Sequence, residues 1–321
     1  MTHPQSIGIL EKKFGNRLQQ QVALQNYATA RVGGAAAWFV TVRNANELAD
    51  AVQICWDHNL KFFLLGSGSN VLFSDEGFDG LVILNHAKKI EMKISGEHPT
   101  LWVESGASLG LVARKAALAG LSGLEWAATV PGTVGGAIYG NAGAHGSDMH
   151  RNLLLAEILQ HEKGKSVWKN EDFQFSYRSS IFKRQRRSGV ILSATLNCEY
   201  DDPQKIKERM NVFSEYRRRT QPPGASMGSM FKNPPGDYAG RLIEAAGLKG
   251  YTIAGVKVSE VHANFFVNSD QATASDIYNL VQHVQKTVKK EFNVELELEV
   301  EMIGFNSTAN NDNANHGKAS K

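Results

Sequence analysis

The chain has 321 residues, of which 42% are hydrophobic, and 35 Lys and Arg against 32 Asp and Glu give a net charge of +3. This length predicts two or three domains, and so small a charge surplus does not indicate nucleic-acid binding. Cys55 and Cys198 form no C-x-x-C pair and the ten His show no H-E-x-x-H spacing, so no disulfide framework or metal site is predicted. The N-terminus lacks the apolar segment of a signal peptide, so a soluble cytoplasmic protein without membrane insertion is expected.

The first 85 residues predict a small α/β unit. Residues 1–22 carry apolar side chains at roughly helical spacing and are expected to be a helical lead-in. Asn46 is the expected N-cap of the next helix. Strands are expected at 37–42, 61–65 and 81–84, with a further apolar segment at 71–73. The order is therefore β-α-β-β.

Residues 86–205 predict a second unit rich in strands. Residues 87–101 alternate as a strand does, and Ser108 is the expected cap of a helix that ends before Gly120. Further strands are expected at 153–159, 166–168 and 190–200. The charged run 183–187 is interpreted as a solvated turn.

Residues 206–305 predict a third unit, with the main boundary near 205–220. A helix starts at Pro203 and is ended by residues 221–224. Helices are then expected at 238–246 and 275–292, and strands at 262–267 and 294–303. Residues 306–321 are rich in Asn and lack large apolar side chains, so a disordered tail is expected.

The stretch 126–146 is the most unusual part of the sequence. Six of its 21 residues are Gly, five are Ala, and none is charged. Glycine at this density allows backbone to approach a flat or bulky ligand and leaves N–H groups to point at it. A tight turn against a helix is the alternative. Because two such signals, 131–136 and 141–144, fall close together, a ligand cradle is favoured.

A second glycine-rich segment, 66–70 (GSGSN), follows a predicted strand. It is not a Rossmann loop, because Val71 stands where the third Gly belongs and the next segment reads as a strand. It is not a Walker A loop either, since no G-K-[ST] is present. A nest of backbone N–H groups for a pyrophosphate and a plain turn both remain open.

Candidate catalytic residues are weaker signals when taken alone. Arg178 lies between Phe175 and Phe182, where a stacked or surface position is the more frequent outcome. Ser229 lacks the G-x-S-x-G elbow of an acyl-transfer nucleophile. Glu297, Glu299 and Glu301 alternate and share one face of a strand, so spacing does not single out one of them.

Taken together, these motifs resemble those of the UDP-N-acetylenolpyruvoylglucosamine reductase (MurB) family of bacterial cell-wall synthesis, over residues 25–304. The similar segments are 29–34, 66–70, 131–136 with 141–144, 177–180, 228–234, 239–250, 258–265 and 298–304. The closing segment singles out Glu299. The short 216–304 region resembles the shorter of two family types. The chain departs from the usual pattern at Ala128, Thr129, Gly140, His145 and Glu301, the last where an Arg is common.

The resemblance implies an α+β protein. Two subdomains, 1–85 and 86–205, form an FAD-binding fold of the vanillyl-alcohol-oxidase/PCMH type, and a C-terminal α+β domain, 206–305, binds substrate. FAD is held non-covalently and reduced by NADPH, and the enolpyruvyl ether of a UDP-sugar is then reduced to a lactyl ether. The chain is expected to be a monomer.

The resemblance also implies roles for individual residues. Arg178 and Glu299 stabilise the enol-like species and Ser229 protonates the carbon. The residues assigned to FAD are Arg31, Gly66, Ser67, Gly68, Ser69, Asn70, Pro131, Gly132, Thr133, Gly135, Gly136, Asn141, Ala142 and Gly143. Those assigned to substrate are Tyr177, Lys232, Asn233, His262 and Asn264. A side chain added at Gly68 or Gly135 is expected to weaken FAD binding more than folding.

Two other functions stay open at this point. A flavin-dependent sugar or alcohol oxidase of the same fold predicts fast reoxidation by oxygen instead of NADPH use. A non-catalytic nucleotide-binding protein predicts loss of the catalytic side chains, whereas Arg178, Ser229 and Glu299 are all present.

Overall fold

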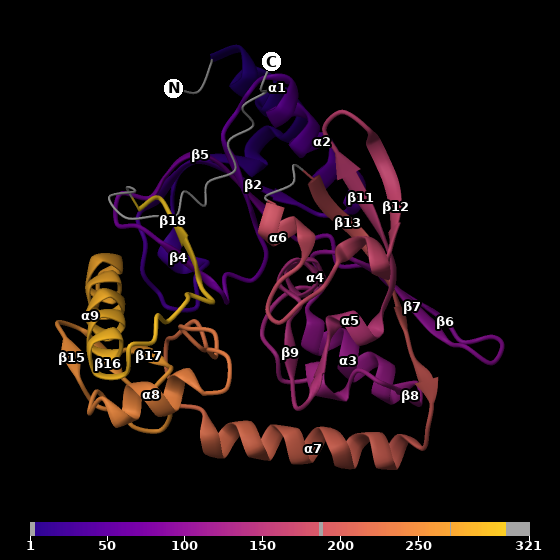
Figure 1. Ribbon diagram of the computed structural model, residues 1–321. Coiled ribbons are helices and arrows are strands. Elements are labelled where there is room, and N and C mark those ends of the chain that lie inside the picture. Colours follow the sequence, from indigo (N-terminus) through magenta and orange to yellow (C-terminus); the bar gives the residue numbers. More distant parts are fainter. Residues whose placement is uncertain (1–3, 186–188, 270, 306–321) are drawn as a thin grey trace.

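The computed structural model describes residues 4–185, 189–269 and 271–305. Figure 1 shows the N-terminal unit at the top, a second unit below it on the right, and the C-terminal unit at the lower left. Helix α7 (Pro203–Thr220) runs along the bottom and joins the second unit to the C-terminal one. The expected disordered tail, 306–321, lies outside the described residues.

The N-terminal unit is a mixed sheet in the order β1-β2-β5-β3, covered by helices. Its elements are α1 (Pro4–Phe14), β1 (Leu18–Ala23), β2 (Ala35–Val42), α2 (Ala45–Asp57), β3 (Phe62–Leu65), β4 (Val71–Phe73) and β5 (Phe78–Asn85). Helix α2 buries Leu48, Val52 and Cys55. Burial in this apolar core raises the pKa of the Cys55 thiol to about 12.

Two expectations for this unit were wrong. Residues 18–22 belong to a strand, because β1 pairs antiparallel with β2 and this pairing outweighs the helical spacing of its apolar side chains. The cap of α2 is Asn44, whose side chain accepts a hydrogen bond from Glu47 N, and not Asn46. The apolar segment after the GSGSN loop is a strand, β4, as the sequence indicated.

The second unit is an antiparallel sheet in the order β12-β11-β13-β7-β6 with short helices against it. The strands are β6 (Ile90–Lys93), β7 (Thr100–Glu104), β11 (Leu153–Gln160), β12 (Gly164–Lys169) and β13 (Gly189–Asn197). The helices are α3 (Leu109–Leu118), α4 (Val134–Gly140), α5 (Met149–Asn152) and α6 (Ile181–Gln185). Two small antiparallel pairs are β8 (Leu121–Ser122) with β14 (Glu199–Tyr200), and β9 (Gly143–Ala144) with β10 (Ser147–Asp148).

Ser108 caps α3 as predicted, accepting from Leu111 N. The interpretation of residues 183–187 as a solvated turn was wrong for its first part. Lys183 and Arg184 lie in helix α6, which is anchored by the buried side chains of Ile181 and Phe182. Residues 186–188 lie outside the described part of the chain.

The C-terminal unit packs two helices on a small sheet. Its elements are α8 (Ala239–Ala245), β15 (Thr252–Ile253), β16 (Val256–Val258), β17 (Phe266–Asn268), α9 (Ala274–Phe292) and β18 (Glu301–Ile303). The strand expected at 262–267 begins later, at Phe266, because residues 262–265 form a turn closed by a Phe265 N to His262 O bond. The strand expected at 294–303 is limited to β18, and Leu298 makes only an isolated bridge to Phe231.

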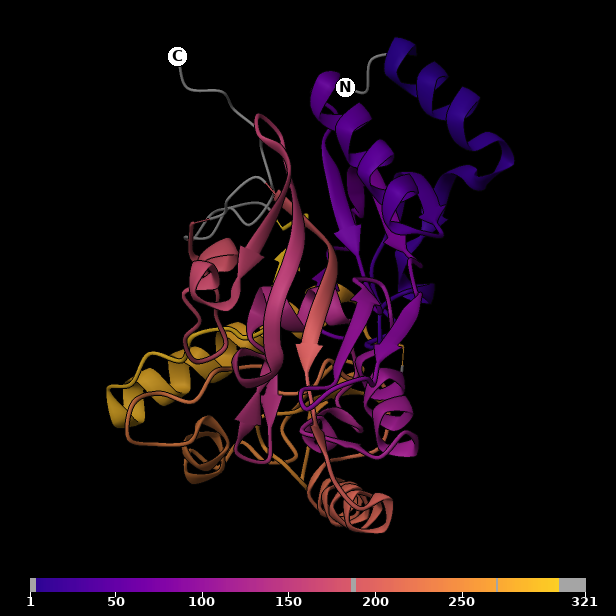
Figure 2. The ribbon, with the colours of Figure 1, turned by 90° about the vertical axis from the view of Figure 1, so that its right-hand side faces the viewer.

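Strand β18 does not join the C-terminal sheet but pairs parallel with β4 of the N-terminal unit. Glu301 N donates to Asn70 O, and the Asn70 side chain donates to Glu299 O. The end of the chain therefore lies beside the GSGSN loop. Figure 2, turned by 90°, shows α1 and α2 at one end of the molecule, α7 at the other, and the long strands of the second unit between them.

Asp75, just after β4, provides a second connection, since its carboxylate accepts bonds from Ala274 N, Ser275 N and Ser275 Oγ at the start of α9. Burial by itself raises the pKa of this carboxyl. The three hydrogen bonds together lower the pKa by more than burial raises it, so the pKa is lowered overall. A lowered pKa means that the carboxylate stabilises the fold above the pKa of the unfolded chain. This contribution is lost as pH falls through the folded-state pKa.

We therefore expect Asp75→Ala to destabilise the protein by about 0.5–2 kcal/mol at neutral pH, the usual loss for a helix-capping side chain. The difference from wild type should shrink as pH falls through the carboxylate range. Urea unfolding at stepped pH measures this. Asp79→Ala, an exposed carboxylate of β5, is the matched control and should stay within about 0.5 kcal/mol of wild type. A difference that did not depend on pH would contradict the assignment.

Candidate active site

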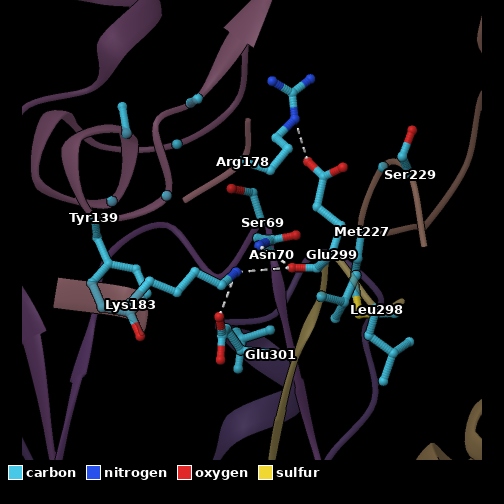
Figure 3. A pocket seen from close by; sticks show the side chains of 18 of the residues that line it. Ser69, Asn70, Tyr139, Arg178, Lys183, Met227, Ser229, Leu298, Glu299 and Glu301 are labelled. Carbon is cyan, nitrogen blue, oxygen red and sulfur yellow. Dashed lines mark hydrogen bonds and ion pairs between the residues drawn. The ribbon is translucent and has the colours of Figure 1, made fainter. Parts of the chain in front are cut away.

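A cavity of about 1550 Å³ lies where the units of the chain meet. Its lining comes from the β3–β4 loop, the glycine-rich stretch, α6 and the loop before it, the Ser229 segment and the strand that ends at Ile303. Figure 3 shows several of these side chains converging from different parts of the chain. This volume exceeds that of most single-ligand pockets, so it has room for a dinucleotide and a second molecule.

The two glycine-rich loops lie side by side in this cavity. The Ser67 hydroxyl contacts the Ser69 hydroxyl, and Ser69 Oγ donates to Pro131 O across the two loops at 3.3 Å. Among the described residues, none accepts a hydrogen bond from the backbone N–H of Ser67, Gly68 or Ser69. Free N–H donors beside hydroxyl groups fit a pyrophosphate, which favours a nest over a plain turn.

The glycines of these loops divide into two groups. At Gly132, Gly136 and Gly140 an added Cβ would meet nothing closer than 3.5 Å. These positions line the cavity and leave its wall free of side chains. The wall therefore offers the flat backbone surface that a flavin ring or a pyrophosphate requires.

At Gly68 and Gly135 an added Cβ would meet protein instead. It would lie 1.8 Å from Tyr27 O at Gly68, where φ is +65°, and 2.9 Å from Ser105 Cβ at Gly135. The expectation that side chains there would spare folding was therefore wrong, because the missing Cβ makes room for neighbouring chain. Gly66 and Gly143 also face protein within 2.7 Å.

Arg178 forms the centre of the polar side of the cavity. Its Nε donates to Glu299 Oε1 at 2.9 Å, and its Nη2 donates to Gly143 O at 2.8 Å. Its backbone is left-handed, with φ of +53°. The guanidinium also lies over the Tyr177 ring, yet it is only 25% exposed. Arg178 therefore joins the glycine-rich stretch to the last strand.

The three alternating glutamates of the closing segment each meet a cation. Glu297 pairs with Lys232, Glu299 with Arg178 and Glu301 with Lys183. Glu297 is 76% exposed, whereas the Glu299 and Glu301 side chains are 21% and 19% exposed. The solvated-face interpretation therefore holds only for Glu297.

Burial raises the pKa of Glu299, and the charges of Arg178, Lys183 and Lys232 with the Arg178 hydrogen bond only partly offset this. A carboxyl with a raised pKa between cations, in a cleft, is a typical feature of functional sites. Its protonated form can donate a hydrogen bond to a developing negative charge.

Ser229 lies beside Glu299 in the cavity (Figure 3). The segment that carries it is held by Asn264, which is 2% exposed. Asn264 Oδ1 accepts from Phe231 N, and Asn264 Nδ2 donates to Phe231 O. Met230 N donates to Asn264 O. Asn264 thus holds the Ser229 segment through its backbone and does not line the cavity.

The structure places several other predicted residues away from this cavity. Asn233 accepts a bond from Ala239 N at the start of α8, and its own N–H donates to Tyr177 Oη. His262 Nδ1 accepts from Asn264 N. Asn141 is 3% exposed and bonds Asp148, Ser176 and His150. Arg31 lines a second cavity.

The remaining predicted residues line the main cavity: Gly66, Ser67, Gly68, Ser69, Asn70, Pro131, Gly132, Thr133, Gly135, Gly136, Ala142, Gly143, Arg178, Ser229, Lys232 and Glu299. Sequence analysis missed Lys183 and Tyr139, which also line it, and did not recognise the role of Glu301. A signal was available for Glu301, since it replaces a residue that is commonly Arg. No spacing rule pairs residues 183 and 301.

Comparison with known proteins agrees with this geometry. Residues 36–169 match the model of the FAD binding domain, and residues 220–303 match the model of the UDP-N-acetylenolpyruvoylglucosamine reductase C-terminal domain. The reductase of Bacillus subtilis (strain 168) is 41% identical over 298 residues, which cover 92% of this chain and 97% of that protein. The reductase of Bacillus licheniformis is 42% identical, covering 92% and 96%.

The crystal structure of UDP-N-acetylenolpyruvylglucosamine reductase from Thermus caldophilus superposes with a TM-score of 0.76 at 36% identity, covering 89% of this chain and 99% of that one. The fold and the matched domain define an FAD-containing oxidoreductase, and the predicted α+β class is confirmed. The chain belongs to the UDP-N-acetylenolpyruvoylglucosamine reductase family. No helix in the described ranges is both long and apolar enough to span a bilayer.

The glycine geometry predicts that two substitutions act differently. Gly136→Ala adds a methyl group in helix α4 that points into open cavity. It should keep or raise apo-protein stability, by up to about 1 kcal/mol, while weakening FAD binding by about 1–3 kcal/mol. Gly68→Ala should instead destabilise the apo-protein by about 1–3 kcal/mol or more, because its Cβ meets backbone. Apo-protein melts and FAD titrations separate the two. Equal loss of stability in both variants would refute this division.

Proposed function

We propose that the chain reduces the enolpyruvyl group of UDP-N-acetylglucosamine enolpyruvate to the lactyl group of UDP-N-acetylmuramate, a step in peptidoglycan precursor synthesis, through bound FAD and at the expense of NADPH. The observation that carries this is the Arg178–Glu299 pair beside Ser229, in one cavity with the exposed glycine wall. The proposal includes a monomeric, cytoplasmic enzyme.

The residues present fit FAD. The wall at Gly132, Gly136 and Gly140 is free of side chains, and the N–H groups of residues 67–69 find no acceptor in the part of the chain that the structure describes and lie beside two hydroxyls. These two loops would hold the pyrophosphate and the flavin without a covalent bond. Bound FAD supplies the chemistry of hydride transfer, from NADPH to the alkene carbon.

Arg178 and Glu299 would stabilise the reacting group. Hydride addition to the alkene places negative charge on the adjacent carbon and its carboxylate. A guanidinium and a carboxyl that are mutually bonded and largely shielded from water stabilise such charge more strongly than solvent does. Because Arg178 is also bonded to Gly143 O, it is already oriented before substrate arrives.

Ser229 is the proposed proton donor to that carbon. It lines the cavity next to Glu299 on a segment that Asn264 holds through backbone bonds. Lys232 lines the same cavity and offers a cation for the substrate phosphates. The Arg178–Glu299 pair is the feature that favours this reaction over an alcohol or sugar oxidase. Reoxidation by molecular oxygen does not require an anchored cation for a substrate carboxylate.

The test of this function uses the purified holoenzyme. The protein should be yellow, acid denaturation should release its flavin to the supernatant, and NADPH should be consumed only when the enolpyruvyl sugar nucleotide is present. Flavin that stayed on the precipitate would indicate a covalent oxidase. Fast reoxidation by oxygen without the sugar nucleotide would favour the oxidase as well.

Ser229 separates the two halves of the reaction. Ser229→Ala should leave anaerobic flavin reduction by NADPH near normal, because that step needs no proton from Ser229. Reoxidation by the sugar nucleotide should slow by a factor on the order of 10² or more, the typical contribution of a positioned general acid. Ser229→Cys should recover part of this loss. Stopped-flow measurements of each half decide it. Equal slowing of both halves would mean that Ser229 only shapes the pocket.

A further inference from the structure

A second ion pair, between Lys183 and Glu301, lies in the same cavity as the Arg178–Glu299 pair and has no role in the reaction described so far. Lys183 extends from α6 across the cavity, past Tyr139, to the strand that carries the glutamates (Figure 3). Its Nζ lies 2.7 Å from Glu301 Oε1 and 3.4 Å from Glu299 O. The Lys183 and Glu301 side chains are only 18% and 19% exposed.

We propose that Lys183 and its partner Glu301 are positioning residues whose opposite charges together set how readily the Glu299 carboxyl is protonated. The proposal rests on the proposed function, in which Glu299 stabilises the negative charge formed on the substrate. Lys183 does not contact the Glu299 carboxyl. It acts through its charge and its bond to the Glu299 carbonyl.

The charges around Glu299 support this assignment. Arg178 approaches from the loop before α6, Lys183 from α6 itself, and Lys232 from the Ser229 segment. Glu297 and Glu301 flank Glu299 along the chain, Glu297 in the segment before β18 and Glu301 at its first residue. Burial raises the pKa of Glu299, and the positive charge of Lys183 opposes that rise. The negative charge of Glu301 offsets the electric field of the Lys183 ammonium. Glu301 therefore sets how strongly Lys183 lowers the pKa of Glu299.

The geometry of the pair suits a charge role. Glu301 Oε1 is buried and lies close to the ammonium, yet it lacks the alignment of a hydrogen bond. A pair whose function was only to tie α6 to β18 would gain most from aligned hydrogen bonds. Close, shielded charges without that alignment interact mainly through the field, which the nearby Glu299 also experiences.

The field explanation makes a prediction that a mechanical tie does not. Removing the cation with Lys183→Met should raise the pKa of Glu299, since the nearest unbalanced charge is then Glu301. Removing the anion with Glu301→Gln should lower it, since Lys183 is then uncompensated. The double variant Lys183→Met, Glu301→Gln should fall between the two single variants. Lys183→Arg, which keeps the charge, should stay near wild type.

Two measurements test this on the holoenzyme. The first is the pH dependence of reoxidation of the reduced flavin by the sugar nucleotide, with the Glu299 limb identified by its absence in Glu299→Gln. The second is an infrared pH titration of the Glu299 carboxyl, obtained as the difference from Glu299→Gln, which needs no substrate. The Glu299 limb of the reoxidation profile and the infrared titration should both move to higher pH for Lys183→Met and to lower pH for Glu301→Gln. Flavin reduction by NADPH should keep its pH dependence in both.

Shifts of equal sign, or no shift in either variant, would overturn the proposal and leave the pair as a structural tie. Lys257→Met and Glu260→Gln, which break a surface ion pair of the C-terminal unit, are the matched controls and should move neither titration. If wild-type protein shows no reoxidation by the sugar nucleotide at any pH, the proposed function fails. The infrared titration still decides whether Lys183 and Glu301 act on Glu299.

Discussion

The parallel pairing of β4 with β18 is the constraint on which the site depends. It joins residues 71–73 to residues 301–303, at opposite ends of the chain, and places the glutamate segment directly beside the GSGSN loop. The chain reaches β18 after it has formed the other elements of the C-terminal unit. The pairing of β18 with β4 therefore also holds the C-terminal unit against the N-terminal unit. Ile303 packs in the core of the N-terminal unit together with Phe73. A strand of three residues thus brings the GSGSN loop and the candidate catalytic carboxyl into one cavity.

The site then concentrates charge where water is scarce. Arg178 and Lys183 of the second unit meet Glu299 and Glu301 near the end of the chain, and Lys232 meets Glu297 within the C-terminal unit. Burying charges costs free energy unless each is paired. The pairs nearest the cavity are the shielded ones, and the exposed pair, with Glu297, lies at the rim. Glu299 therefore lies among several opposing charges and is largely shielded from water.

The glycines illustrate how one sequence signal serves two physical purposes. Gly132, Gly136 and Gly140 leave a wall open for a ligand, whereas Gly68 and Gly135 leave room for neighbouring protein. The close packing at the second group lies behind the loops, which are within hydrogen-bonding distance of each other at Ser69 and Pro131. Composition identifies the stretch as unusual. Only the direction in which a Cβ would point shows whether a glycine leaves room for a ligand or for neighbouring protein.

The sequence by itself determined the α+β class, the strand after the GSGSN loop, the Ser108 cap and the candidate triad of Arg178, Ser229 and Glu299, because these depend on local periodicity, capping chemistry and motifs that resemble a known family. It misread residues 18–22 and the length of the last strand, where pairing with distant chain overrides local pattern, and it misplaced the starts of α2 and β17, where a local cap and a local turn set the boundary. Only the tertiary structure showed that Lys183 and Glu301 pair in the cavity, and that Asn141, Asn233, His262, Asn264 and Arg31 do not line it. Burial and charge pairing depend on the whole three-dimensional arrangement, as in the pairing of Lys183 with Glu301, and no local spacing records them.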